Sequence, residues 1–333
     1  MPLGPLARIA FAALLLWPAS AQNPLPPLSG VAELPSTEAA QPPRTYAVNQ
    51  AHPQASDDNP GTEAKPFKTI GNEDCVVRNC LIANNEGAGI FYEISYGLRV
   101  EDNVIVGNGF DSGAGAWGAN GGVSLSSSPH CVVERNLIVG NREGFQFREQ
   151  IRSTTRIDES KDRRQAIWNH DSIIRNNTLA YNQDAQIAGW FDVQDLRYWP
   201  TSMRKEMTVL FAASGAEPRD DIAAPYKAKG AEGAPGDLSL EQLNLAIENN
   251  LYAVSEGQKL VQWGCKWRPH KEYVNIEGVQ RELAFEKAGR VESVVFKNVL
   301  AFDLRVAPDS PALKMGCYPK GDVPDAKLGV IQK

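Results

Sequence analysis

Ionisable side chains follow several short apolar runs in the middle of the chain. Glu93 directly follows GIFY, Arg148 and Glu149 follow GFQF, and Asp192 follows GWF. Glycosidases place two carboxyl groups on either side of a sugar bond and keep one of them protonated. Uronate lyases instead neutralise a substrate carboxylate with Arg, Lys or Ca²⁺ and use a base for the adjacent proton. Both kinds of group are present, so these four residues and His170, in WNHD, are candidate catalytic residues.

Tryptophan rings offer flat apolar faces that suit sugar rings in a concave site. The candidate substrate-binding residues are Trp117, Trp168, Trp190 and Trp263. Each candidate of either kind also has a structural explanation. Glu93 and Arg148 could form an ion pair between neighbouring strands, Asp192 could cap a turn, and His170 could bond the backbone at a corner. Trp190 could simply cover a neighbouring insert, so the sequence leaves both interpretations open.

The elements that would position these residues are repeated along the chain. Six phrases share a Val or Ile followed three residues later by a polar residue, and begin at Val77, Val100, Val133, Ile174, Ile247 and Val295. Their asparagines are Asn103, Asn136, Asn177, Asn250 and Asn298, with Cys80 in the first phrase. A second polar column stands five residues further on, at Asn85, Asn108, Asn141, Asn182, Ser255 and Asp303. The Asn columns predict stacked corners of an all-β parallel β-helix, in which coils lie ~4.8 Å apart.

A second strand in each coil would carry the candidate site. Alternation directs one set of its side chains into the core, namely Ile90, Tyr92, Val123, Leu125, Phe145, Phe147, Ile187 and Gly189. The outward column is then Glu93, Ser126, Arg148, Trp190 and Trp263. An acid, a guanidinium and two indoles are unusual on a solvated sheet face without a task, which favours a functional face there.

The stretch from Thr45 to Ile70, with its GT-x-x-x-PF-x-TI phrase, resembles the opening of secreted right-handed parallel β-helix proteins. That pectate-lyase-like superfamily includes polysaccharide lyases, glycoside hydrolases and mannuronan epimerases, and the later Asn-rich coils are similar to it as well. The resemblance implies the fold and a carbohydrate-related activity. In relatives PFKTI leads into several further coils, whereas GNEDCVVRNC follows at once here. Some early coils are therefore missing, together with any functional residues they would supply.

The ends of the chain indicate export. Residues 1–21 read as a signal peptide, 22–44 as a Pro-rich linker, 45–317 as the β-helix domain with an insert at about 193–242, and 318–333 as a C-terminal tail. No later segment has the apolar length of a membrane span. The predicted location is therefore secreted or periplasmic. A net charge of −6 without a basic stripe argues against nucleic acid as a partner.

Two classes of function fit these features. The first is a glycoside hydrolase or polysaccharide lyase that acts on an extracellular polysaccharide or oligosaccharide. The second is a non-catalytic glycan-binding or adhesin-like β-helix, or a decayed enzyme. The sequence has no P-loop and no Cys/His zinc spacing, so no cofactor is indicated firmly. A metal, if present, would be Ca²⁺ on carboxylates and carbonyls, and no coordination loop can be named.

The five cysteines allow one disulfide to be proposed. Cys75 and Cys131 hold equivalent places two coils apart, about 9.6 Å, which exceeds the reach of a disulfide. Cys265 and Cys317 end VQWGC and LKMGC, which read as consecutive coils in one register. A Cys265–Cys317 bridge is therefore predicted.

Overall fold

The computed structural model describes residues 53–54, 74–110, 120–154, 164–191, 195–215 and 223–332. Apart from the turn at 53–54, these residues belong to one compact unit, Thr69–Lys333. The predicted signal peptide, the linker and the GT-x-x-x-PF phrase lie outside the described residues. Among the residues that are described, no helix is long and apolar enough to cross a membrane.

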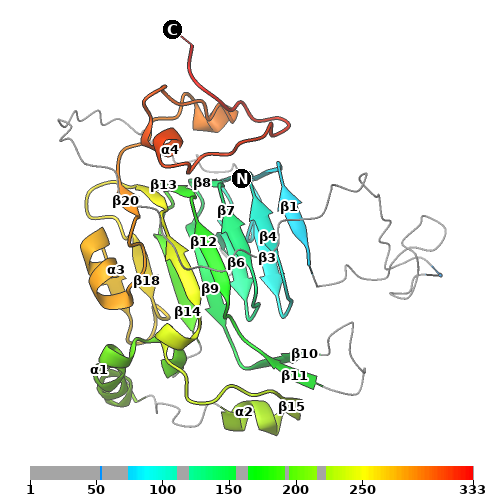
Figure 1. Ribbon diagram of the computed structural model, residues 1–333, viewed down its shortest axis with the longest axis vertical. Helices are drawn as coiled ribbons and strands as arrows, with labels where there is room; N and C mark the ends of the chain where they lie inside the picture. The colour runs from blue at the N-terminus through cyan, green and yellow to red at the C-terminus, as the bar shows by residue number, and fades with distance from the viewer. Residues whose placement is uncertain are drawn as a thin grey trace, which may run out of the picture. The chain divides into compact units, whose positions relative to one another are not determined.

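Successive coils each add one short strand to three mainly parallel sheets (Figure 1). The first sheet contains β1 (Val76–Arg78), β4 (Arg99–Glu101), β7 (Val132–Glu134), β12 (Ser172–Arg175) and β16 (Leu245–Glu248). The second contains β2 (Leu81–Ala83), β5 (Val104–Val106), β8 (Leu137–Val139), β13 (Thr178–Ala180), β17 (Leu251–Ala253) and β20 (Arg290–Val291). The third contains β3 (Ile90–Glu93), β6 (Gly121–Ser126), β9 (Glu143–Glu149), β14 (Ala185–Phe191), β18 (Val261–Trp263) and β19 (Lys271–Tyr273), which is antiparallel to β18. The predicted right-handed parallel β-helix is confirmed.

Asparagine side chains form a ladder at the corner between the first and second sheets. Each carboxamide nitrogen donates to Oδ1 of the next rung at 2.9–3.0 Å, from Asn103 through Asn136 and Asn177 to Asn250. Each of these Oδ1 atoms from Asn136 onward also accepts the backbone N–H of the preceding rung. All four side chains are buried, so every polar atom in the ladder needs these partners. The last rung is Glu286, whose carboxylate accepts hydrogen bonds from Asn250.

A second ladder follows the second sheet, through Asn85, Asn108, Asn141 and Asn182. It ends on Gln186, whose Oε1 accepts from the Asn182 carboxamide at 2.7 Å, so the expected Ser255 rung is wrong. The two ladders explain why Asn phrases recur, because a stack places equal offsets directly above one another.

The phrase that begins at Val295 does not form a further coil. Asn298, predicted as a rung of the first ladder, is exposed and caps the short 3₁₀-helix η4 (Val299–Ala301), so that prediction is wrong. Its Oδ1 accepts the backbone N–H of Ala301 at 3.2 Å instead. The chain has left the stack after β20, and a local match to the repeat cannot show this.

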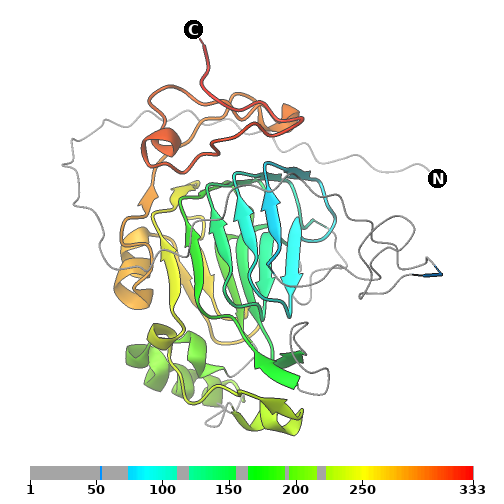
Figure 2. The ribbon, with the colours of Figure 1, turned by 45° about the vertical axis from the view of Figure 1, so that its right-hand side comes forward.

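Residues 294–323 cover the outer face of the second sheet. Buried side chains of this segment pack on the sheet in one apolar cluster. The sheet contributes Val104, Val106, Leu137, Val139 and Leu251. The segment contributes Val294, Phe296, Leu304, Val306, Cys317, Tyr318 and Val323. The strands β5 and β8 of this sheet are therefore buried on both faces, which explains their continuous apolar runs. Tyr318 and Val323 belong to the stretch read as a tail, and both are buried here. The short helix α4 (Pro311–Lys314) lies in the same segment (Figure 2).

The large insert lies between β14 and β16. It contains η2 (Leu196–Tyr198), α1 (Thr201–Ala213), α2 (Ala223–Ala228), β15 (Ala231–Glu232) and η3 (Leu240–Gln242). The hairpin β10 (Arg152–Thr154) and β11 (Arg164–Ile167) pairs with β15 in a small separate sheet. The helix α3 (Ile276–Leu283) follows β19. In Figure 1 the insert and the hairpin lie below the strands of the β-helix, whereas the C-terminal segment lies above them.

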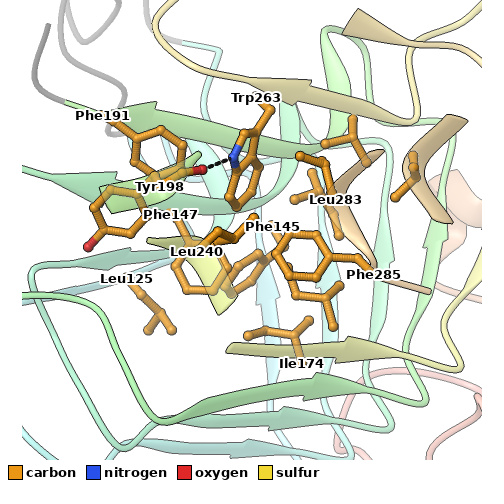
Figure 3. Packing of buried hydrophobic residues seen from close by; sticks show 14 of the residues in the cluster. Leu125, Phe145, Phe147, Ile174, Phe191, Tyr198, Leu240, Trp263, Leu283 and Phe285 are labelled. Atoms are coloured by element: carbon orange, nitrogen blue, oxygen red, sulfur yellow. Dashed lines mark hydrogen bonds between the residues drawn. The ribbon is translucent and has the colours of Figure 1, made fainter. Parts of the chain in front are cut away.

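Aromatic side chains fill the coils that adjoin the insert (Figure 3). Trp263 lies inside, with its indole N–H donating to the Tyr198 carbonyl at 2.6 Å. It pairs with Gly189 and not with Trp190, so its predicted place in the outward column is wrong. A slip of one residue moves a side chain to the other face of a strand. Gly189 makes room for the indole, since an added Cβ would lie 3.0 Å from its ring.

The predicted disulfide does not form, because Cys265 and Cys317 lie on different parts of the molecule and neither is in a disulfide. Cys265 follows β18, and its thiol donates to the Phe191 carbonyl at 2.6 Å. Cys317 lies in the segment over the second sheet, where its thiol donates to the Asn249 carbonyl at 3.1 Å. The prediction fails because LKMGC is not part of a coil.

Candidate metal centre

The outer face of the third sheet carries part of the predicted glycan site. Glu93, Ser126, Arg148 and Trp190 are aligned across β3, β6, β9 and β14. The Ser126 hydroxyl donates to Glu93 Oε1 at 3.1 Å, and Arg148 Nη1 lies 3.8 Å from the same oxygen. Burial lowers the pKa of Arg148, although the charge of Glu93 opposes this effect. Glu93 and Arg148 therefore form the ion pair that was the structural alternative.

Trp190 is fully buried on this face, so its predicted role as a platform for a sugar ring is wrong. Its indole N–H donates to Glu143 Oε2 at 2.9 Å. The ring packs against Trp267 with 4.9 Å between centroids, and the Lys266 ammonium lies 5.1 Å from its centroid. Residues that follow β18 thus cover the indole. Trp263 cannot contact a ligand either, because its side chain is buried in the core.

Glu149, a candidate catalytic residue, does not share the outer face with Glu93. It is fully buried at the end of β9, aligned with Phe191. Burial raises its pKa to about 7, although the charge of Arg197 and the hydroxyl of Tyr198 act in the opposite direction. Trp117 and Asp192 lie outside the described residues, so their roles stay predictions.

A left-handed backbone position recurs at the corner before each first-sheet strand. The residues with positive φ that the strand register aligns there are Asp74, Gly97, His130, Asp171 and Asn244. Asn, Asp and His enter this conformation more readily than most other L-residues, so the corner selects side chains that can also bind metals. The backbone N–H of His130 donates to the His170 carbonyl at 3.1 Å, which joins the two corners.

His130, His170 and Asp171 bring three metal-binding side chains together at these corners. One ligand atom from each lies within 4.8 Å of the others. His170 Nδ1 is 2.6 Å from Asp171 Oδ2, and the two imidazole rings meet edge to face with 5.1 Å between centroids. The Trp168 ring lies against His170 at 4.6 Å. The His170 side chain is 22% exposed and that of Asp171 40%, so an ion can reach the cluster from solvent.

The electrostatics favour a neutral His170 and an ionised Asp171. Desolvation lowers the pKa of His170, and the hydrogen bond to Asp171 only partly opposes it. Burial of Asp171 acts to raise its pKa, but hydrogen bonds from Asn244 and His170 outweigh it and the pKa is lowered. The Asn244 carboxamide donates to Asp171 Oδ1 at 2.6 Å. A neutral imidazole and an ionised carboxylate are the forms that bind a metal ion.

The donor set decides which ions fit. Two imidazoles and one carboxylate suit borderline divalent ions such as Cu²⁺ and Zn²⁺. Ca²⁺ takes about six to eight oxygen ligands, so this cluster does not provide the Ca²⁺ site that was considered. His170 was among the predicted site residues, whereas His130 was missed. The signal was present, because two of the four histidines precede consecutive repeat phrases at nearly the same offset.

Part of the chain matches a known protein family. Residues 67–191 match the family model described as Periplasmic copper-binding protein (NosD), a right-handed β-helix family. The matched segment includes His130, His170 and Asp171. No curated protein and no solved structure matches the chain. A periplasmic family agrees with the predicted export.

Proposed function

We propose that this protein is a periplasmic β-helix that binds copper as Cu²⁺ through His130, His170 and Asp171. The observation that carries the proposal is the convergence of these three donors within 4.8 Å at two stacked corners. The family match over residues 67–191 supports copper as the ion. Imidazole and carboxylate donors place Cu²⁺ high in the affinity order of divalent metals.

Each residue has a distinct part in holding the ion. His130 comes from the corner before β7, whereas His170 and Asp171 come from the corner before β12. The hydrogen bond between His170 Nδ1 and Asp171 Oδ2 keeps these two donors side by side, so an ion would bind between them in place of the shared proton. Partial exposure of the cluster allows the ion to enter and leave, which fits a protein that carries copper.

Copper binding is tested by titrating the full chain with Cu²⁺ against a competing chelator. We expect a site that is lost in His130→Ala and in His170→Ala, because each removes one of the two imidazoles that the described residues bring to the cluster. His270→Ala is the matched control, since His270 bonds Arg268 and Glu272 away from the cluster. Electron paramagnetic resonance should report nitrogen ligands in the wild type and in the control. Equal affinity in all four proteins would refute the proposal.

A glycan-related function is our second proposal, and it rests on Glu93. This carboxylate is 31% exposed beside Arg148 on the outer face of the third sheet. The proposal is weaker because Trp190 and Trp263 are buried and Glu149 lies on the other face. Incubation with plant and algal polysaccharides, followed by assays for reducing ends and unsaturated uronates, tests it. Turnover that Glu93→Ala abolishes would support an enzyme.

A further inference from the structure

Asn169 connects the two corners that carry the histidines. Its side chain is fully buried. Its Oδ1 accepts the backbone N–H of Ser128 at 3.1 Å, two residues before His130. Its Nδ2 donates to the Arg148 carbonyl at 2.7 Å and to Glu149 Oε2 at 3.0 Å. Asn169 itself directly precedes His170, so one carboxamide bridges both corners.

Glu149 holds Asn169 in place through hydrogen bonds. Its Oε2 accepts the backbone N–H of Asn169 at 2.8 Å and the Tyr198 hydroxyl at 2.6 Å. Its Oε1 accepts the Ser127 hydroxyl at 2.8 Å, from the first of the two corners. A single buried carboxylate therefore receives donors from both corners and from η2 of the insert. These hydrogen bonds explain how the Glu149 carboxyl group can be buried although it is not one of the proposed copper ligands.

We propose that Asn169, anchored by Glu149, is a positioning residue of the metal centre. It fixes the separation of His130 and His170 and so sets the affinity and the coordination geometry. This inference rests on the proposed function. Both His130 and Asp171 have left-handed backbone angles, which for residues other than glycine persist only where surrounding contacts impose them. Partners that orient metal ligands from outside commonly change affinity by about 10–100-fold when they are removed.

The experiment compares Asn169→Ala with Asn136→Ala in the full chain. Asn136 is an equally buried rung of the first ladder and donates to two carbonyls and one carboxamide. Both variants should lower the melting temperature, since both leave buried groups unpaired. Only Asn169→Ala should weaken Cu²⁺ binding, by about 10–100-fold, and alter the paramagnetic resonance spectrum. Glu149→Gln keeps the volume of the anchor and should shift affinity in the same direction by less.

The outcomes separate this inference from the copper proposal. If Asn169→Ala and Glu149→Gln retain wild-type affinity and spectrum while His130→Ala loses the ion, the positioning role is refuted and the copper site stands. An equal loss of affinity in Asn136→Ala would show a general effect of stability and would refute the role as well. If His130→Ala binds copper normally, both proposals fail. If Asn169→Ala does not fold, Glu149→Gln decides, through the same titration and spectrum.

Discussion

At the scale of single residues, three buried carboxyl groups have a pKa raised to about 7 by desolvation: Glu143, Glu149 and Glu286. Each is surrounded by donors that favour its ionised form, yet burial outweighs them. Glu286 ends the first asparagine ladder and accepts hydrogen bonds from Asn250 and from the Tyr252 hydroxyl at 2.6 Å. The stability of the last coil therefore depends on the charge of one carboxyl group.

The pH dependence of stability tests Glu286. Its pKa is raised from 4.5 to about 7 in the folded state, so the folded chain binds more protons than the unfolded chain between these values. The contribution of Glu286 to stability is thus full below about pH 4.5 and is lost as the pH rises through 7. In Glu286→Gln, the fall in the free energy of unfolding across this window should be smaller. Urea unfolding at a series of pH values measures it, with exposed Glu256→Gln as the control.

At the scale of elements, the strands of the stack are only two to seven residues long, and the asparagine ladders help to hold them in place. Asn136 shows how one rung serves three coils. It accepts from the backbone and side chain of Asn103, and it donates to the Val100 carbonyl and to Asn177. A buried rung therefore cannot be replaced without leaving polar groups of both neighbouring coils unpaired.

Replacement of a ladder asparagine should lower the free energy of unfolding, because its hydrogen bonds to the neighbouring coils are lost. Asn136→Leu should lower the free energy of unfolding by about 1–3 kcal/mol, because its buried neighbours lose their partners. Asn298→Leu, at the exposed cap of η4, should cost less, although the same pair of residue types is exchanged. Urea unfolding of both variants measures the difference. Equal losses would contradict the ladder as the source of stability.

At the scale of the whole molecule, the β-helix is covered by segments that do not belong to the stack. The insert adjoins the aromatic core, where Tyr198 and Leu240 pack with Phe147 and Trp263 (Figure 3). The C-terminal segment covers the second sheet. Such covers protect apolar strands that would otherwise face water. They also explain why outward side chains of the second sheet, such as Val104 and Leu137, are buried although they point away from the β-helix core.

The C-terminal cover can be tested with two leucines four residues apart. Leu304 is fully buried against the second sheet, whereas Leu300 is 96% exposed. Leu304→Ala should lower the free energy of unfolding by about 2–5 kcal/mol, as large-to-small changes in a core do. Leu300→Ala should change it by less than about 0.5 kcal/mol. Thermal and urea unfolding measure both changes. If Leu304→Ala left the free energy of unfolding unchanged, the segment would not cover the sheet in solution.

The sequence by itself determined the stack. In a solenoid, residues at equal offsets lie above one another, so the recurring Asn phrases predicted both the fold and four rungs of the first ladder. It also placed Glu93, Ser126, Arg148 and Trp190 in one column. Only the tertiary structure decided which of these side chains are covered, because the covering residues follow β18 or come from segments outside the repeat. It likewise showed that Asn298 and Cys317 lie outside the stack, and that His130 lies beside His170 and Asp171. Those histidines are forty residues apart in the chain, and only the loop lengths between coils bring them to adjacent corners.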